Sequence, residues 1–332
     1  MKRIAAPMIG GMVSSTILNL LVIPVLERRA AMILRQFVIS GLSAMFLVFS
    51  FLGHAQAKDS GAKMALDTTA IEQEIGKAGE SKGDVYKIVF PRTDLSVTVE
   101  NVKVKPGLAF GSWMAFRPTG RAAVVDGDLV LTEDEVYPVL RELQQHGLKV
   151  TAIHNHLLQE SPRVMYLHFW GRDDAAKLAS GLKQALIQTK TPLTDPKDKG
   201  VEQDGFDAEQ IQQTLGQKGI LKEGVLKVSV PRQEKITVHG VELPPSMGMA
   251  TALNFQAAGE GKVAATGDFV MIGEEVNPVA RSLVEHGIRV TALHNHLIHD
   301  SPDLFFMHFW AHDSSEKVAR GLRAGLDAMQ KQ

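Results

Sequence analysis

Cysteine is absent from the 332-residue sequence. The chain therefore forms no disulfide, has no thiol nucleophile, and cannot carry a lipid on an N-terminal cysteine. Any transition-metal ion has to be held by histidine, carboxylate or methionine side chains.

An excess of charge of either sign is also missing, since 36 Lys and Arg residues stand against 37 Asp and Glu residues. This balance removes the long-range attraction that draws basic proteins to nucleic acid or anionic lipid, so we expect no nucleic-acid partner. Neither a phosphate-binding glycine loop, nor a dinucleotide fingerprint, nor a nucleophile motif occurs in the chain. An enzymatic activity would therefore have to depend on a metal.

Long apolar runs are confined to the beginning of the chain. Residues 1–31 include an uncharged stretch from Ala5 to Leu26, which is long enough to span a bilayer. This segment resembles the last transmembrane segment of heavy-metal efflux pumps of the resistance-nodulation-division type, over about 26 residues. So short a match implies no pump activity for the chain.

Residues 32–57 have the three parts of a secretory signal peptide. A charged start at Met32 is followed by an apolar run from Phe37 to Leu52 and by an Ala-x-Ala motif that ends at Ala57. We expect cleavage near Ala57 and a periplasmic or secreted product. The alternative is a chain tethered to the inner membrane, with membrane contact only through the uncleaved N-terminal segment.

The remaining chain contains the same plan twice, with matching residues 140 positions apart over most of its length. We expect a first domain at 58–190, a linker at 191–206 and a second domain at 207–332. Each domain has short strand-like runs in sequence, with turns between them and helices to one side. This order predicts an α+β fold of two tandem homologous domains, each a mainly antiparallel sheet with helices packed on it.

The longest identical strings in the two copies carry histidines. Val-Thr-Ala-Ile-His-Asn-His-Leu at 150–157 returns as Val-Thr-Ala-Leu-His-Asn-His-Leu at 290–297, and each copy is followed at equal distance by a His-Phe-Trp string. The β-branched residues predict a strand on which the two histidines of the first string point the same way, about 7 Å apart at Cα. A turn then leads to a second strand-like run, so a hairpin would bring the third histidine to the first two. The predicted trios are His154, His156 and His168, and His294, His296 and His308.

Three imidazoles from a hairpin are a known way to bind zinc or a similar divalent ion. We take zinc as the first expectation and copper as the alternative, and we predict a metal site in each repeat. The histidines would otherwise form a polar hydrogen-bond network inside the hairpin. Whether the two trios remain separate or share one site is left open by the sequence.

Other polar and aromatic residues are candidates for supporting roles. Glu135 and Glu275 suit the first turn of a helix, and Thr132 with Glu135 has a capping-box pattern; they are also weak candidates for a fourth ligand or a general base. Arg92 and Arg232 would clamp a small-molecule anion or form ion pairs with Asp128 and Asp268. Trp170 and Trp310 would wall the site or fill the core, and Met247 with Met249 would bind a soft ion or pack in a strand.

The string His-Asn-His-Leu, then Ser-Pro, then His-Phe-Trp, preceded by Glu-Val-x-Pro-Val and His-Gly-x-x-Val-Thr-Ala, resembles the LppY/LpqO family. The resemblance covers two tandem copies, about 71–186 and 211–329. It implies an exported bacterial domain of unknown function. It does not imply the lipid anchor of family members, because this chain lacks the cysteine.

Three functions fit these observations. The first is an exported, periplasmic protein that binds a divalent metal and takes part in metal homeostasis. The second is a metal-dependent hydrolase that uses a metal-bound water. The third is a non-catalytic exported binding module whose histidines are structural.

Overall fold

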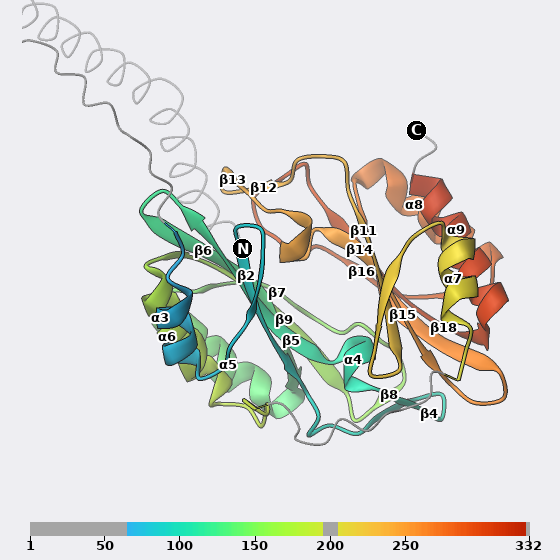
Figure 1. Cartoon of the computed structure of the whole chain (residues 1–332), viewed down its shortest axis with the longest axis horizontal. Coiled ribbons are helices and arrows are strands. Elements are labelled where there is room, and N and C mark those ends of the chain that lie inside the picture. The colour runs from blue at the N-terminus through green and yellow to red at the C-terminus, as the bar shows by residue number, and fades with distance from the viewer. Residues whose placement is uncertain (1–64, 195–204, 330–332) are drawn as a thin grey trace, which may run out of the picture. The chain divides into compact units, whose positions relative to one another are not determined.

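The computed structural model describes residues 65–194 and 205–329 (Figure 1). The pump-like segment predicted at 1–31 and the signal peptide predicted at 32–57 lie outside the described residues, as does most of the linker predicted at 191–206.

The first repeat contains its secondary structure in an order close to that predicted. Its elements are α3 (Thr68–Ile75), β1 (Glu80–Lys82), β2 (Val85–Pro91), β3 (Val97–Val99), β4 (Val102–Val104), α4 (Pro106–Ala109), β5 (Gly111–Thr119), β6 (Ala122–Thr132), α5 (Glu133–Gln145), β7 (Lys149–His154), β8 (Glu160–Ser161), β9 (Val164–Asp173) and α6 (Ala175–Leu186).

The second repeat follows the same order, with a short 3-10 helix in place of α4. Its elements are α7 (Ala208–Leu215), β10 (Gly219–Lys222), β11 (Val225–Pro231), β12 (Thr237–Val238), β13 (Val241–Glu242), η2 (Pro245–Met247), β14 (Ala250–Ala257), β15 (Lys262–Met271), α8 (Gly273–Glu285), β16 (Arg289–His294), β17 (Asp300–Ser301), β18 (Phe305–Ser314) and α9 (Ser315–Met329).

Each repeat has a six-stranded antiparallel sheet, in the orders β1-β2-β5-β6-β9-β7 and β10-β11-β14-β15-β18-β16. Strands β6 and β7 both run antiparallel to β9, so they are parallel to one another and need a crossover, which α5 supplies. The predicted α+β fold of two tandem domains is therefore confirmed. The crossover puts β9 between β6 and β7, and this places the third histidine of each repeat in the interior of its sheet.

Helices cover one face of each sheet. In Figure 1, α3, α5 and α6 lie together on one side of the first sheet, and α7, α8 and α9 lie together on one side of the second. The reason is the alternation of side chains along a strand: in β9, Leu167 and Phe169 join the core beneath the helices, whereas Trp170 belongs to a different cluster.

The opposite faces of the two sheets pack against each other. Two apolar clusters contain buried residues of both repeats: one joins Trp170 and Ala115 to Met247 and Phe306, and the other joins residues of the first repeat to Trp310. The outer faces are thus closed by helices and the inner faces by the other repeat. Within residues 65–194 and 205–329, no helix combines the length and the apolar content that crossing a membrane requires.

Candidate metal centre

The six histidines predicted as metal ligands occupy equivalent places in the two repeats. His154 and His294 are the last residues of β7 and β16, and His168 and His308 lie on β9 and β18. The expectation that His156 shares a strand with His154 was wrong, since the strand ends at His154 and His156 lies in the loop that follows. Its ring still lies near that of His154, with centroids 5.1 Å apart.

The predicted hairpin geometry brings each third histidine to its companions. Strand β7 pairs with β9 so that Ala152 lies opposite His168, and β16 pairs with β18 so that Ala292 lies opposite His308. The ring centroids of His154 and His168 are 5.0 Å apart, and those of His294 and His308 are 4.9 Å apart.

The two trios meet in one place, which the sequence did not reveal. Across the repeats, ring centroids lie 3.6 Å apart for His154 and His294, 3.7 Å for His156 and His308, and 3.8 Å for His168 and His296. These contacts are shorter than those within either trio. The six rings therefore form one histidine cluster on the boundary between the repeats, so of the two arrangements that the sequence left open the trios adopt the shared one.

The contacts follow an approximate two-fold symmetry. His154 stacks on its own counterpart His294, while the His156–His308 contact is the counterpart of His168–His296. Hydroxyl and backbone groups join the two halves directly at this point, because Thr291 Oγ1 donates a hydrogen bond of 2.6 Å to the carbonyl oxygen of His156.

Two sets of donor atoms within the cluster are close enough to hold an ion. One ligand atom from each of His154, His156, His296 and His308 lies within 4.8 Å of the others, and so do ligand atoms of Asp128, His156 and His168. Donors around a tetrahedral zinc are about 3.4 Å apart, given Zn–N bonds of about 2.0–2.1 Å. A modest contraction of the side chains would therefore complete the four-histidine group, which draws two ligands from each repeat.

The Nε2 nitrogens of the cluster have no hydrogen-bond partner within the described part of the chain. The Nε2 atoms of all six histidines are buried without a hydrogen-bond partner. Buried polar atoms in proteins are nearly always paired, because an unpaired one loses its hydration without compensation. A shared cation would satisfy these nitrogens.

Burial also sets the charge state of the cluster. Loss of solvation lowers the pKa of His154 to about 3 and that of His294 to about 4. Burial, followed by the neighbouring imidazoles, holds the pKa values of the other four well below the ordinary 6.5. All six rings are hence neutral near pH 7 and have a nitrogen lone pair, the form that binds a metal.

Contacts around the cluster orient its rings. His308 Nδ1 lies 3.1 Å from the carbonyl oxygen of Gly267; since a carbonyl only accepts, Nδ1 carries the proton and Nε2 keeps the lone pair. Tyr166 stacks on His156 with centroids 3.3 Å apart, and Phe306 stacks on His296 at 3.7 Å.

Asp128 lies next to the cluster, which the sequence analysis did not predict. It is opposite His168 in the β6–β9 register, and its Oδ1 is buried without a hydrogen bond, 3.8 Å from His168 Nε2. Burial, followed by repulsion from Asp268, raises the pKa of Asp128 well above its usual value. The Gly-Asp pair that occurs at 127–128 and again at 267–268 is the sequence feature that could have indicated this aspartate. A side chain at Gly267 would lie 1.8 Å from the Ala252 carbonyl oxygen, so only glycine fits beside the acid.

The predicted pairing of Arg92 with Asp128 was wrong. Arg92 is fully buried and donates to Glu135 Oε2 at 2.7 Å, to Asp94 Oδ2 at 2.8 Å and to the carbonyl oxygen of Val130 at 2.6 Å. Burial opposes the charge of Arg92, yet its two acidic partners outweigh that effect and raise its pKa. Arg92 is therefore occupied by a structural ion pair and has no role as an anion clamp.

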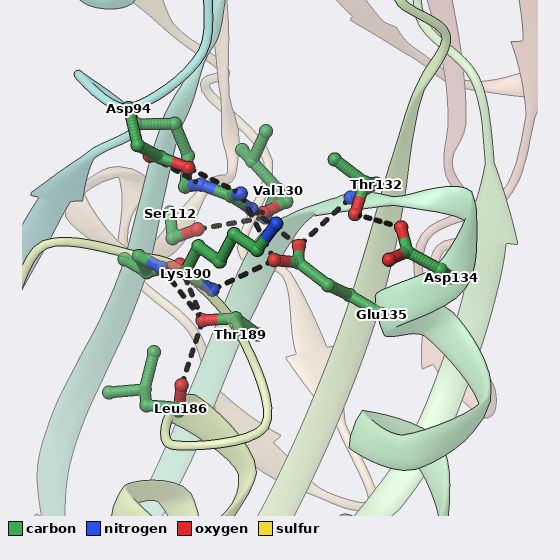
Figure 2. Close-up of polar contacts among 11 residues, drawn as sticks. Asp94, Ser112, Val130, Thr132, Asp134, Glu135, Leu186, Thr189 and Lys190 are labelled. Carbon is green, nitrogen blue, oxygen red and sulfur yellow. Dashed lines mark hydrogen bonds and ion pairs between the residues drawn. The ribbon is translucent and has the colours of Figure 1, made fainter.

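Glu135 belongs to the same ion pair and not to the histidine groups. Its Oε2 accepts from the Thr132 backbone N–H at 2.9 Å, as the predicted capping box requires, and its Oε1 accepts from the Lys190 N–H at 2.8 Å. Figure 2 shows the Glu135 carboxylate between Thr132 and Lys190. These contacts leave it no place as a ligand or general base.

The second repeat repeats this arrangement. Arg232 donates to Glu275 Oε2 at 2.6 Å and to Glu234 Oε1 at 2.6 Å, and Glu275 also accepts from the Ile272 N–H at 2.8 Å. The predicted pairing of Arg232 with Asp268 was therefore also wrong, and Glu275 is a structural residue as well.

Trp170 and Trp310 are core residues rather than walls of the site. Each is buried in one of the two clusters between the repeats, and Trp310 Nε1 donates to Glu100 Oε2 at 3.0 Å. Met247 and Met249 are buried in the cluster that contains Trp170. They pack in the interior as predicted, but the predicted strand was wrong, since Met247 lies in η2 and Met249 lies between η2 and β14.

A cleft of about 450 Å³ adjoins the histidine cluster and takes its lining from both repeats. His156, His168, His296 and His308 line it, together with apolar side chains such as Trp113 and Met249. Its charged lining residues are Lys82, Lys87, Lys227, Asp126, Asp128 and Asp268. The sequence had indicated only Asp128 and Asp268 among them, and only as partners of the arginines.

Comparison with known proteins places both repeats in one family. The model of the family described as "Domain of Unknown Function (DUF1259)" matches residues 69–188 and 209–328, well over half of the chain. No curated protein matches the sequence.

Among solved structures, similarity is found to the trimeric bacterial microcompartment shell protein PduB and to EtuB from Clostridium kluyveri. PduB is 13% identical, over 76% of this chain and 91% of that one, with a TM-score of 0.21. EtuB is 10% identical, over 76% and 89%, with a TM-score of 0.19. Likenesses this weak carry no argument about function.

Proposed function

We propose that this chain, which belongs through both repeats to the family described as "Domain of Unknown Function (DUF1259)", binds a divalent transition-metal ion in its histidine cluster. The observation that carries the proposal is the set of six buried Nε2 atoms without hydrogen-bond partners, four of whose residues offer ligand atoms within 4.8 Å of one another. A purely structural histidine network would pair these nitrogens with one another or with other polar groups.

Zinc is the metal that this set of donors suits best. Neutral imidazoles, with a carboxylate in reach, are common zinc ligands, and zinc accepts the four-coordinate arrangement that the group His154, His156, His296 and His308 offers. Copper is the alternative, because imidazole also suits copper.

The cellular role that we propose is metal binding outside the cytoplasm, linked to metal homeostasis. It is supported by the Ala-x-Ala motif that ends at Ala57 and by the pump-like sequence at 1–31. We also propose that the repeats are of the LppY/LpqO type, on the strength of the shared histidine, Ser-Pro and Phe-Trp strings.

The direct test is elemental analysis of protein purified without an affinity tag, in wild type and in the double variant His156→Ala/His308→Ala. This variant removes one ligand of the four-histidine group from each repeat. The matched control is His146→Ala/His286→Ala, which removes two exposed histidines at the ends of α5 and α8.

We expect a stoichiometric metal in wild type and control and its loss in the cluster variant, with circular dichroism showing that all three remain folded. Absence of metal from wild type even after incubation with zinc, or retention of metal by the cluster variant, would contradict the proposal.

A second candidate function is a metal-dependent hydrolase, which the acids in the cleft favour. Burial raises the pKa of Asp268 to about 7, a value suited to a general base near neutral pH. For this role the three-ligand group of Asp128, His156 and His168 would hold the ion, which would leave a coordination position for a water, and Asp268 would be the group that takes a proton from that water. Hydrolysis of p-nitrophenyl esters that depends on added zinc and is lost in Asp268→Asn would support it, whereas equal rates in the two proteins would exclude this role for Asp268.

A further inference from the structure

The cleft beside the histidine cluster has the size of a small-molecule site. Its volume of about 450 Å³ lies within the range of about 300–1,000 Å³ that is usual for ligand pockets. Both repeats line it, with apolar groups such as Leu108, Trp113 and Met249 among the polar ones. A metal ion by itself would need no such volume.

Lys87 is positioned as a ligand-binding group in this cleft. Its Nζ lies 3.9 Å from the ring centroid of Trp113 and donates to the carbonyl oxygen of Ser246 at 3.3 Å. An ammonium group has three N–H donors, so one hydrogen bond leaves capacity for another acceptor. Trp113 and Ser246 come from different repeats, and together they hold the charged end of Lys87 at the cleft.

The second repeat supplies the counterpart of Lys87. Lys227 occupies the equivalent place on β11, 140 residues later, and lines the same cleft, as does Lys82 of β1. Two lysines related by the approximate symmetry therefore line the cleft that the symmetric histidine cluster adjoins.

Charged residues line the cleft, and a metal ion bound in the histidine cluster would increase the attraction of the cleft for anions. Lys82, Lys87 and Lys227 line the cleft together with Asp126, Asp128 and Asp268. A divalent ion in the neutral histidine cluster would add two positive charges beside this lining. At short range in a partly buried cleft, these charges attract an anion strongly.

We propose that the cleft binds a small organic dicarboxylate, one carboxylate lying on Lys87 and Lys227 and the other reaching toward the metal ion. This inference rests on the proposed metal site. Two carboxylates match the two positive groups at the cleft, the lysine pair and the metal ion, and apolar lining residues such as Leu108 and Met249 suit a short carbon chain.

The test is isothermal titration calorimetry of the zinc-loaded full chain with succinate, with butane-1,4-diol as the neutral probe. Succinate should bind and the diol should not. Lys87→Gln/Lys227→Gln should bind succinate at least tenfold more weakly while keeping its zinc, and Lys317→Gln on α9, which removes an exposed charge, should behave as wild type. Metal-free wild type should also bind at least tenfold more weakly.

Absence of succinate binding to the zinc-loaded protein, or equal binding by the double lysine variant, would overturn the inference while leaving the metal site intact. If the wild type takes up no zinc, the proposed function fails. Succinate binding that still falls in the double lysine variant would then keep the anion site, and unchanged binding would remove it.

Discussion

The two repeats contribute the same three histidines to the cluster but different acids to the cleft beside it. In the first repeat, Asp126 and Asp128 both line the cleft, whereas in the second the counterpart of Asp126 is Thr266, whose hydroxyl donates to the Phe309 carbonyl oxygen at 2.7 Å. Asp128 offers a ligand atom close to those of His156 and His168, and its counterpart Asp268 belongs to neither donor group. The set of imidazoles is therefore nearly symmetric, whereas the carboxylates beside it come mainly from the first repeat.

The same inequality divides a symmetric pair of histidines. His154 and His294 stack on each other, yet the four-histidine group contains His154 and not His294. An ion in this group would therefore not lie on the two-fold axis that relates the repeats. Substitution of the equivalent residue in the second repeat is thus a matched control for a substitution in the first.

Replacing the two buried arginines should produce the largest difference in stability between equivalent variants of the two repeats. Arg92→Met should lower the free energy of unfolding by about 3–5 kcal/mol, because it leaves the buried Glu135 carboxylate without its cation. Arg232→Met should cost less, because the second partner of Arg232, Glu234, is 42% exposed, against 20% for Asp94. Urea unfolding of both variants measures the difference, and an equal loss would show that solvent access does not distinguish the two sites.

The next largest difference is expected in zinc affinity, between variants of His154 and of its counterpart His294. His154→Ala should weaken zinc binding by more than about 100-fold, the upper range for groups that only support a ligand, because it removes a ligand itself. His294→Ala should weaken it by less. Competition with a chromogenic chelator gives both affinities, and equal losses would mean that the ion lies on the two-fold axis.

The pH dependence of the metal-free protein follows from the depressed pKa values of the histidines. Between about pH 3 and 6.5 the unfolded chain binds protons on these residues that the folded chain does not, so stability rises with pH and falls as pH drops below about 6.5. Five acids act in the opposite sense, because burial raises their folded pKa values: Asp126, Asp128, Glu160, Asp268 and Asp300.

The six cluster histidines outnumber these five acids, so the slope is positive, at up to about 1.4 kcal/mol per pH unit for each net proton. Urea unfolding at several pH values measures the slope. Asp268→Asn, which removes one opposing acid of the second repeat, should make the slope steeper. A stability independent of pH would contradict the assignment of buried neutral histidines.

Replacing the two tryptophans should produce the smallest difference in stability between the repeats. Trp310 Nε1 donates to Glu100, whereas Trp170 Nε1 is buried without a hydrogen-bond partner among the described residues. Trp310→Phe should therefore cost about 1 kcal/mol more than Trp170→Phe, since only the former breaks a hydrogen bond. Thermal unfolding of the two variants gives this difference directly.

Much of the fold followed from the sequence because its signals are local. Alternating apolar residues, the Thr132–Glu135 capping box and the stop at Gly147 fix strands and helices through neighbours in the chain. The convergence of each histidine trio followed in the same way, from a hairpin that joins His154 to His168.

What the sequence did not reveal depends on contacts between distant segments. The stacking of His156 on His308 joins residues of different repeats, and so does the hydrogen bond from Lys87 to the Ser246 carbonyl oxygen. The partner of Arg92 was misjudged for a related reason. Both Asp128 and Glu135 are acids close in sequence, and only the packing of α5 against the sheet brings Glu135 to the guanidinium.

Because the four-histidine group takes half of its ligands from each repeat, an ion held there would tie the halves of the chain together as a crosslink does. Halves produced as separate polypeptides would then bind each other more tightly with zinc than after its chelation, because the apolar clusters between the repeats remain in both states. A protein with a single repeat of this kind would have to mate face to face with a second copy of itself to complete the same coordination.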